Sequence, residues 1–360
     1  MGVEGRSATA PQDDDILYIG LDLGTSQSSI VTSTDIRRTV TSVVGWPKDL
    51  ISYKFLQKQV VIGDECLENR MAVDMIWPLE HGVFRHRPSD EEEAATPESD
   101  REAEAMQHLV SYIVDMAEAN PGQEIRAVIG SPARATVEDR AALTEAVKGL
   151  VQVSMVASEP FLVAYGLELF NNALIIDIGA GTLDLCCMHG TIPGEEDQRT
   201  LLKAGNSVDA RFHMLLQEKV NDSPVTLEMA RRIKEQYAFV SSNKEVIAVD
   251  FQVDGKPRTY DLTNELREAC ESVLPDLIDS AKELIVGFDP EFQNELRQNI
   301  LLAGGGSQIR GLGEEVRSNL SEFGPCRVTV VEDPVYAGAL GALKLAQDMP
   351  ESEWRRYADG

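Results

Sequence analysis

The chain has 360 residues, enough for two domains that each bury their own core, and 43% of them are hydrophobic, as is ordinary for a soluble globular protein. Its formal net charge of −27 opposes binding to nucleic acid or to anionic lipid, and no dense basic patch offsets it. No apolar run approaches the roughly 20 residues that cross a bilayer, and the five cysteines and five histidines lack metal-ligand spacing. These features favour a cytoplasmic protein without a membrane-inserting segment, a nucleic acid partner or a zinc site.

The first part of the chain is predicted to begin with a disordered polar tail over residues 1–15. Two strands joined by a turn follow to Thr32, and "RRTVTSVVGW" contains further short strands. Residues 46–82 mix a strand with short helical pieces, which suggests a small subdomain. Residues 85–104 are acidic and almost free of large apolar side chains, so we expect an exposed loop that leads into a helix over 105–119.

The next segment alternates strands and helices. "EIRAVIGSPA" is predicted to be a strand, Thr136 opens an amphipathic helix, and "VQVSMVA" is a second strand. A helix from Glu159 to about Phe170 then leads into a hairpin in "IIDIGAGTLDL". This alternation implies an α/β architecture.

The remainder of the chain continues the pattern. A loop, a strand and a helix are expected in "TIPGEEDQRTLLKAGNSVDARFHMLLQEK", and a second helix in "TLEMARRIKEQYAFV". A strand pair turned at Asp254-Gly255 follows. More helices, the strands "NILLAG" and "RVTVVE", and a final helix "PVYAGALGALKLAQ" complete the prediction.

Two of the predicted hairpins have the composition of phosphate-binding turns. Their glycines leave backbone N–H groups accessible and their hydroxyls add donors, a combination that binds anions; the residues are Gly24, Thr25 and Ser26 in one turn and Gly179, Ala180, Gly181 and Thr182 in the other. An aspartate precedes each turn, Asp22 and Asp177, and would face the same phosphates. Since like charges repel, a cation is needed between them, and Mg²⁺ fits because it keeps its own waters and takes few carboxylates. Because this motif occurs twice, at equivalent positions, it favours a duplicated fold whose two turns bind one nucleotide from opposite sides.

A third glycine cluster, "LLAGGGSQIRGL", follows a strand and contains Gly304, Gly305, Gly306 and Ile309. Glycines there let the backbone lie flat against a planar group or a phosphate, and the helix that follows favours anions. A Rossmann site is the obvious competitor, but no strand with a ribose-binding acid follows about 20 residues later. No GxxxxGK[ST] loop is present, so the chain is not a P-loop ATPase.

These motifs resemble, in order, the five signature elements of the actin, sugar-kinase and Hsp70 ATPases. The matching segments are two phosphate loops (22–26 and 177–182), two connecting helices ("ASEPFLVAYG" and "PVYAGALGAL") and an adenosine loop (304–309). The resemblance implies an actin-like ATPase fold in which two duplicated α/β domains, each with a smaller subdomain, enclose a nucleotide cleft. It places domain I at 16–160 plus 334–360, with a small subdomain at about 46–82, and domain II at 161–333, with a small subdomain at about 206–260.

The resemblance also implies roles for individual residues. Glu159 matches the acid that positions and polarises the attacking water in bacterial actins, although a glutamate in the first turn of a helix can simply complement the helix dipole. Lys234 and Glu235 match ribose and base contacts, or form an exposed charged pair on a helix. Ala180 occupies a position that is often glycine in relatives. No lysine follows Thr25, so Mg²⁺ and backbone amides would carry more of the phosphate charge. The implied cofactors are ATP or ADP and Mg²⁺.

Several loops, including "GTIPGEEDQ" and "SVVGWPKDLI", resemble the magnetosome-associated bacterial actins, which build cytoplasmic filaments that align magnetosomes. The implied function is ATP hydrolysis coupled to a head-to-tail filament, with the chain itself and magnetosome-associated proteins as partners alongside the magnetosome membrane. Two alternatives stay open: a monomeric phosphotransferase of the sugar-kinase type, and a rod-shape or plasmid-segregation actin. The polar N-terminus argues against the rod-shape type, and no set of acceptor-binding residues is recognisable.

Overall fold

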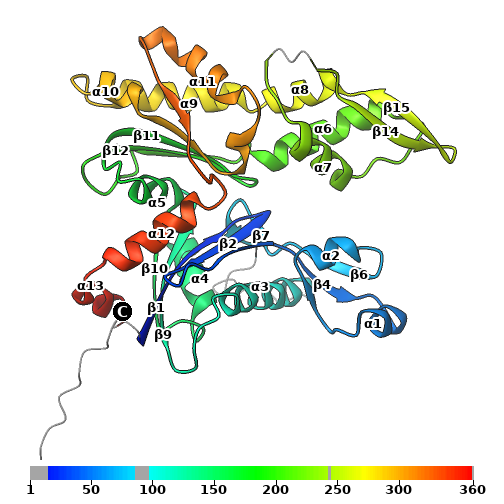
Figure 1. Cartoon of the computed structure of the whole chain (residues 1–360), viewed down its shortest axis with the longest axis horizontal. Coiled ribbons are helices and arrows are strands. Elements are labelled where there is room, and N and C mark those ends of the chain that lie inside the picture. Colours follow the sequence, from blue (N-terminus) through cyan, green and yellow to red (C-terminus); the bar gives the residue numbers. More distant parts are fainter. Residues whose placement is uncertain (1–14, 86–96, 242–244, 359–360) are drawn as a thin grey trace, which may run out of the picture.

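The computed structural model describes residues 15–85, 97–241 and 245–358. Its main feature is a pair of five-stranded sheets stacked one above the other (Figure 1). The predicted tail over 1–15 therefore lies outside the described residues except for Asp15. No helix of the described ranges is long and apolar enough to cross a membrane.

The two sheets share one topology. In each, three consecutive strands form an antiparallel meander, and two later strands add in parallel beside the first strand of the meander. The first sheet has the order β3-β2-β1-β9-β10, and its strands are β1 (Ile16–Leu23), β2 (Gln27–Thr32), β3 (Arg37–Thr41), β9 (Glu124–Ser131) and β10 (Val153–Ser158). The second has the order β13-β12-β11-β16-β17, with β11 (Asn171–Ile178), β12 (Leu183–His189), β13 (Gln198–Leu201), β16 (Ile300–Ala303) and β17 (Val328–Val330). This confirms the duplicated α/β architecture.

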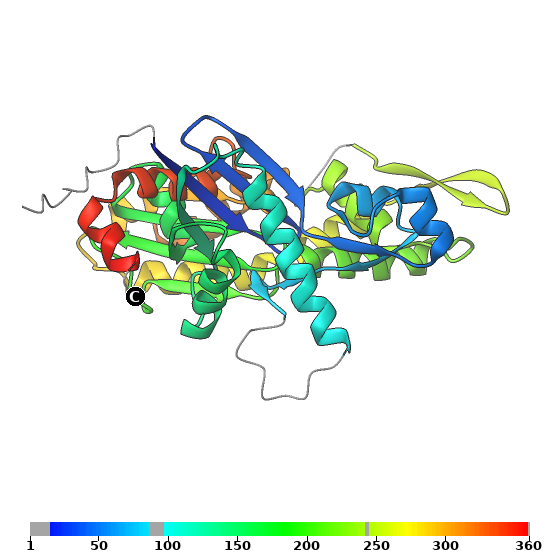
Figure 2. The same ribbon diagram turned by 90° about the horizontal axis from the view of Figure 1, so that it is seen from below.

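Each sheet has its own apolar core. The central strands are buried on both faces, so β1 and β11 read as nearly continuous apolar runs rather than as alternating ones. Around the first sheet pack α3 (Pro97–Asp115) and α4 (Val137–Val147), and Figure 2 shows α3 crossing its lower face. Around the second pack α9 (Leu274–Gly287), α10 (Gln293–Gln298) and α11 (Leu312–Leu320). Two 3₁₀ turns, Gly305–Gln308 and Ser321–Phe323, flank α11.

A small group of elements extends from each half at the same end of the molecule (Figure 1). On the first half these are β4 (Val44–Pro47), α1 (Leu50–Leu56), β5 (Val61–Ile62), α2 (Asp64–Glu68) and β6 (Val73–Ile76), followed by the hairpin β7 (Leu79–Glu80) and β8 (Val83–Phe84). On the second half they are α6 (Gly205–Lys219), α7 (Leu227–Tyr237), β14 (Ala248–Val253), β15 (Lys256–Asp261) and α8 (Thr263–Glu271). Exact domain boundaries stay a prediction.

Two helices cross between the sheets, α5 (Glu159–Gly166) and α12 (Ala337–Asp348) (Figure 1). Their backbones touch, because a Cβ atom on Gly341 would lie only 1.8 Å from the carbonyl oxygen of Leu162. Gly166 is also constrained, though less tightly, since its Cβ would lie 2.9 Å from the Cα of Gly341. Small residues at this crossing let the two connecting helices pack at backbone distance, and they join the two halves of the molecule behind the cleft.

The structure corrects the sequence prediction at three helices. The loop predicted to run to residue 104 is wrong over Pro97–Glu104, which forms the start of α3, while residues 86–96 lie outside the described residues. Glutamate and alanine are good helix formers, so low apolar content did not mean a loop there. The helix expected to reach Phe170 ends at Gly166, and Glu168 has a left-handed φ of 58°. A further helix, α13 (Glu351–Ala358), follows the predicted final helix and buries Trp354.

Candidate functional site

A cleft of about 420 Å³ opens between the two halves, in the size range of small-molecule sites. All the site residues predicted from the sequence line it: Asp22, Gly24, Thr25, Ser26, Glu159, Asp177, Gly179, Ala180, Gly181, Thr182, Lys234, Glu235, Gly304, Gly305, Gly306 and Ile309. They come from segments up to 287 positions apart (309 − 22) that the duplicated topology brings together. Their roles in binding and catalysis remain proposals.

The two predicted phosphate turns occupy equivalent places, at the β1–β2 and β11–β12 hairpins. They also touch each other, because a Cβ on Gly181 would lie 2.2 Å from Thr25 Oγ1. The β7–β8 hairpin supports both turns: Gly82 N–H donates to Thr25 Oγ1 at 2.8 Å, and His81 Nδ1 donates to the carbonyl oxygen of Gly181 at 2.9 Å. Since a carbonyl oxygen can only accept, the bond fixes the proton on Nδ1.

Carboxylates converge at the base of the cleft. Glu159, at the start of α5, lies against Gly130, whose missing side chain leaves room for it: a Cβ there would come 3.0 Å from Glu159 Cγ. Gly130 pairs with Asp22 in the β1–β9 register, which brings Glu159 next to Asp22. Asp177 lies on the other half, at the equivalent end of β11.

Burial and mutual repulsion raise the pKa of these acids. Burial raises the pKa of Asp22 to about 6. The pKa of Glu159 lies well above its ordinary range, first through burial and then through repulsion from Asp22 and Asp177. The pKa of Asp177 is likewise raised by burial and by the charge of Asp22. A cation entering the cleft would reverse this effect, because it stabilises the ionised carboxylates.

These side chains are not arranged to bind a metal ion directly. Within the described ranges, no three His, Cys, Asp or Glu side chains are arranged to hold a metal ion. Asp22 and Asp177 lie on opposite sides of the cleft, where they fit an ion that keeps most of its water shell, as Mg²⁺ does. The donor set is therefore compatible with a hydrated Mg²⁺ held through water and phosphate.

Asp184, on β12, is a buried acid of this region that the sequence reasoning did not include. It accepts hydrogen bonds from Ala133 N–H at 2.8 Å and from Thr200 Oγ1 at 2.5 Å. Burial raises its pKa, and the hydrogen bonds oppose that shift. Since Ala133 belongs to the first half and Asp184 to the second, the bond ties the halves together beneath the phosphate turns.

The far wall of the cleft contains a buried ion cluster on α6 and α7. Asp209, 2% exposed, pairs with Lys234 Nζ at 2.8 Å and with Arg231 Nε at 3.3 Å. Glu235 is exposed, but partial desolvation of its carboxyl raises its pKa. Lys234 is therefore held inside this cluster, whereas Glu235 beside it stays exposed on the helix surface. Asp209 and Arg231 were missed, although Arg231 lies only three positions before the predicted Lys234.

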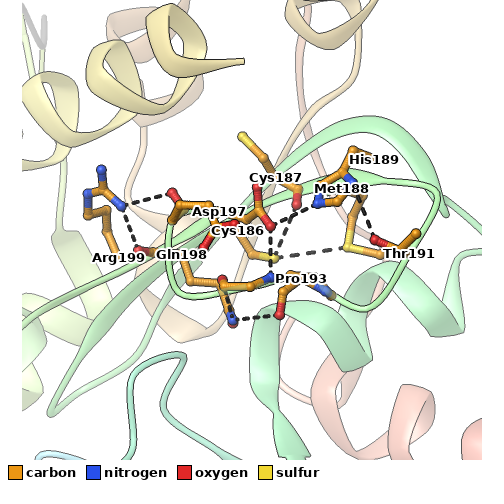
Figure 3. Close-up of polar contacts among 11 residues, drawn as sticks. Cys186, Cys187, Met188, His189, Thr191, Pro193, Asp197, Gln198 and Arg199 are labelled. Carbon is orange, nitrogen blue, oxygen red and sulfur yellow. Dashed lines mark hydrogen bonds and ion pairs between the residues drawn. The ribbon is translucent and has the colours of Figure 1, made fainter. Parts of the chain in front are cut away.

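The loop "TIPGEED" between β12 and β13 lies outside the cleft, and its contacts are drawn in Figure 3. Asp197 holds its base: its Oδ2 accepts from Gly194 N–H at 2.7 Å and contacts His189 Nε2 at 2.8 Å. Gln198 Nε2 donates to the carbonyl oxygen of Gly194 at 3.1 Å. The loop is therefore a fixed surface feature rather than part of the nucleotide pocket.

Comparison with known proteins gives the family. Residues 17–353 match the family described as MreB/Mbl protein. The chain belongs to the MreB/Mbl family. It is 42% identical over 343 residues to the actin-like protein MamK of Paramagnetospirillum magneticum, covering 95% of this chain and 96% of that protein. MamK of Magnetospirillum gryphiswaldense is also 42% identical, with 95% and 92% covered.

Solved structures agree with this family. The fold matches a MamK double helical filament with a TM-score of 0.87 and 42% identity, covering 93% of this chain and 100% of that one. A non-polymerising MamK mutant bound to AMPPNP matches with a TM-score of 0.69 at 42% identity, covering 93% and 99%. Membership of this family sets aside the sugar-kinase alternative that the sequence left open.

A first prediction concerns Asp22 and pH. Because its pKa is about 6 in the folded protein and near 4 when unfolded, the folded state binds the extra proton, and its stability falls as the pH rises through this interval. We expect Asp22→Asn to stabilise the nucleotide-free protein by about 2 kcal/mol at pH 7.5. The gain should shrink as the pH falls from 6 towards 4.

Thermal unfolding in EDTA between pH 4.5 and 8 measures this difference. Asp254→Asn, at the exposed β14–β15 turn, is the control and should leave stability nearly unchanged at each pH. A D22N protein that is less stable than the parent at pH 7.5 would show that the Asp22 carboxylate stabilises the empty cleft.

Proposed function

We propose that the chain is an actin-like filament protein that binds ATP with Mg²⁺ in the cleft, assembles head to tail and hydrolyses ATP to control filament turnover. The observation that carries the proposal is the convergence of two equivalent phosphate turns and three acids, Asp22, Asp177 and Glu159, on one cleft between duplicated halves. Relatives that cover nearly the whole chain support it, since one is described as a filament and another as AMPPNP-bound.

In the proposed mechanism the backbone amides of the two turns hold the phosphates, and Thr25 adds a hydroxyl donor. Asp22 and Asp177 would hold a hydrated Mg²⁺, which would supply positive charge to neutralise the phosphates. Glu159 orients the attacking water and takes its proton, because it lies at the base of the cleft beside both acids. Lys234, Glu235 and the glycine loop 304–306 line the part of the cleft that remains for ribose and base.

Assembly follows from the same geometry. Closure of the cleft changes the surfaces at both ends of the subunit, and a repeated heterologous contact that does not close into a ring gives an open filament. With a net charge of −27, subunits repel one another, so moderate salt or divalent cations should strengthen assembly. The resemblance of the surface loops to magnetosome-associated actins supports a role in positioning magnetosomes from cytoplasmic filaments, with magnetosome-associated proteins as partners.

The test is sedimentation with ATP and Mg²⁺, with ADP and Mg²⁺, and without nucleotide, across a salt series and with electron microscopy of the pellets. We expect filaments with ATP and Mg²⁺, and their loss as ATP is hydrolysed. A protein that stays monomeric under all conditions, with or without ATP turnover, would refute the filament proposal.

A further inference from the structure

The chain has three tryptophans, and each lies under an arginine guanidinium. Arg101 lies 5.4 Å from the centroid of Trp46, and Arg126 lies 5.8 Å from that of Trp354. Both of these pairs are within the first half of the molecule. The third pair differs, because Trp77 follows β6 of the first half whereas Arg231, 5.2 Å from its centroid, lies on α7 of the second.

Both partners of the third pair are fixed to their own halves. Trp77 packs against the small apolar cluster of Val43, Val61, Cys66 and Val73. Arg231 is held on the opposite side by Asp209, through an ion pair of 3.3 Å, and by Glu228 at 3.8 Å. The Arg231 side chain is only 16% exposed, so its contact with Trp77 is largely shielded from water.

The Trp77–Arg231 pair lies beside the cleft and connects the two halves of the molecule. Arg231 lines the cleft one helical turn before Lys234 and Glu235. The small groups of elements that carry Trp77 and Arg231 project at the same end of the molecule, one on each half (Figure 1). Their separation must increase when the two halves move apart, and the Trp77–Arg231 contact must then break.

We propose that Trp77 and Arg231 form a latch across the cleft that holds the halves closed on bound nucleotide and slows its release. The proposal rests on the nucleotide binding proposed above. Trp77 acts as a positioning residue, since it fixes the guanidinium of Arg231 without lining the cleft itself. A shielded cation–π contact is worth about 1–2 kcal/mol. Its loss should therefore speed release by roughly 5- to 30-fold, at about 1.4 kcal/mol per factor of ten.

The experiment measures dissociation of a fluorescent ATP analogue with Mg²⁺ by stopped-flow chase with unlabelled ATP. We expect Trp77→Leu to release the analogue about 5- to 30-fold faster than the parent. Trp46→Leu is the matched control, because it removes the same kind of Trp–Arg pair inside one half, and its release rate should stay within about twofold of the parent. Trp77→Phe keeps an aromatic face over Arg231 and should restore most of the slow release.

A double-mutant cycle separates the latch from general loosening of the fold. Arg231→Gln also perturbs Asp209, so its own effect is not diagnostic. In the W77L background, however, R231Q should accelerate release less than it does in the parent, since the shared contact is already lost. Additive effects, or a W77L protein that releases as slowly as the parent, would overturn the latch. A parent protein that does not bind the analogue at all would instead refute the proposed nucleotide site.

Discussion

Glu159→Gln is expected to lower ATP hydrolysis by about 10²- to 10⁴-fold while leaving ATP binding largely intact. Glutamine has nearly the same shape as glutamate, but it cannot accept the proton of the attacking water. The site favours this result because Glu159 is half-buried beside Asp22 and Asp177. A carboxylate there serves as a base once a cation has lowered its raised pKa.

Hydrolysis is measured by phosphate release and binding by equilibrium titration with a fluorescent ATP analogue. Glu168→Gln is the control: Glu168 follows α5 closely, but it lies outside the cleft and pairs with Lys344 at 3.3 Å. Its hydrolysis rate should match that of the parent. If E159Q hydrolyses ATP at the parental rate, the assignment of Glu159 as the base is wrong.

The same variant connects chemistry to assembly. With ATP and Mg²⁺, E159Q should form filaments that persist, because the closed ATP-bound subunit is no longer converted to the ADP form. Parental filaments should disappear as ATP is consumed. Filaments of E159Q that disassemble as fast as those of the parent would show that hydrolysis does not time disassembly.

The duplicated architecture could be predicted from the sequence alone, because the same local hairpin motif occurs twice. A β-hairpin with an aspartate and a small-residue turn is visible in "YIGLDLGTSQSS" and again in "IIDIGAGTLDL", and both occupy equivalent places in the two sheets. The start of α4 was also visible, because Thr136 forms a capping box with Asp139.

Other features were not local and so could not be predicted. Trp77 and Arg231 are 154 positions apart (231 − 77), and only the assembled fold brings them within 5.2 Å. The bond from Ala133 N–H to Asp184 likewise crosses between the two halves. The extra turns of α3 were missed for a different reason: an acidic segment without apolar periodicity predicts exposure, and an exposed helix has the same composition as a loop.

The three glycines of the 304–306 cluster have different surroundings, which the sequence did not predict. All three glycines were expected to bring the backbone close to a ligand. In the structure, only Gly305 has open space where its Cβ would be. Gly304 has a φ of 73°, and its Cβ would lie 2.3 Å from Asp177 Oδ1. The Cβ of Gly306 would lie 2.3 Å from Ile178 Cγ2. All three glycines line the cleft, but Gly304 and Gly306 also pack against β11, and only Gly305 has room for a side chain.

This difference predicts opposite effects on stability for neighbouring substitutions. Gly304→Ala should destabilise the nucleotide-free protein by about 3 kcal/mol, because alanine is strained at positive φ and its Cβ would displace Asp177. Gly305→Ala should leave thermal unfolding of the nucleotide-free protein almost unchanged, since its Cβ enters open space.

Nucleotide binding should fall in both variants, for different reasons. In G304A the shift of Asp177 disturbs the side chain proposed to orient the hydrated Mg²⁺, so the loss should be larger with Mg²⁺ present than in EDTA. In G305A the added methyl group occupies space that faces the cleft, so the loss should be the same with and without Mg²⁺. Titration with the fluorescent analogue in both buffers, beside thermal unfolding without ligand, resolves the two effects. A G305A protein that binds as tightly as the parent would place the nucleotide away from this glycine, because a methyl group cannot share the volume of a bound base or ribose.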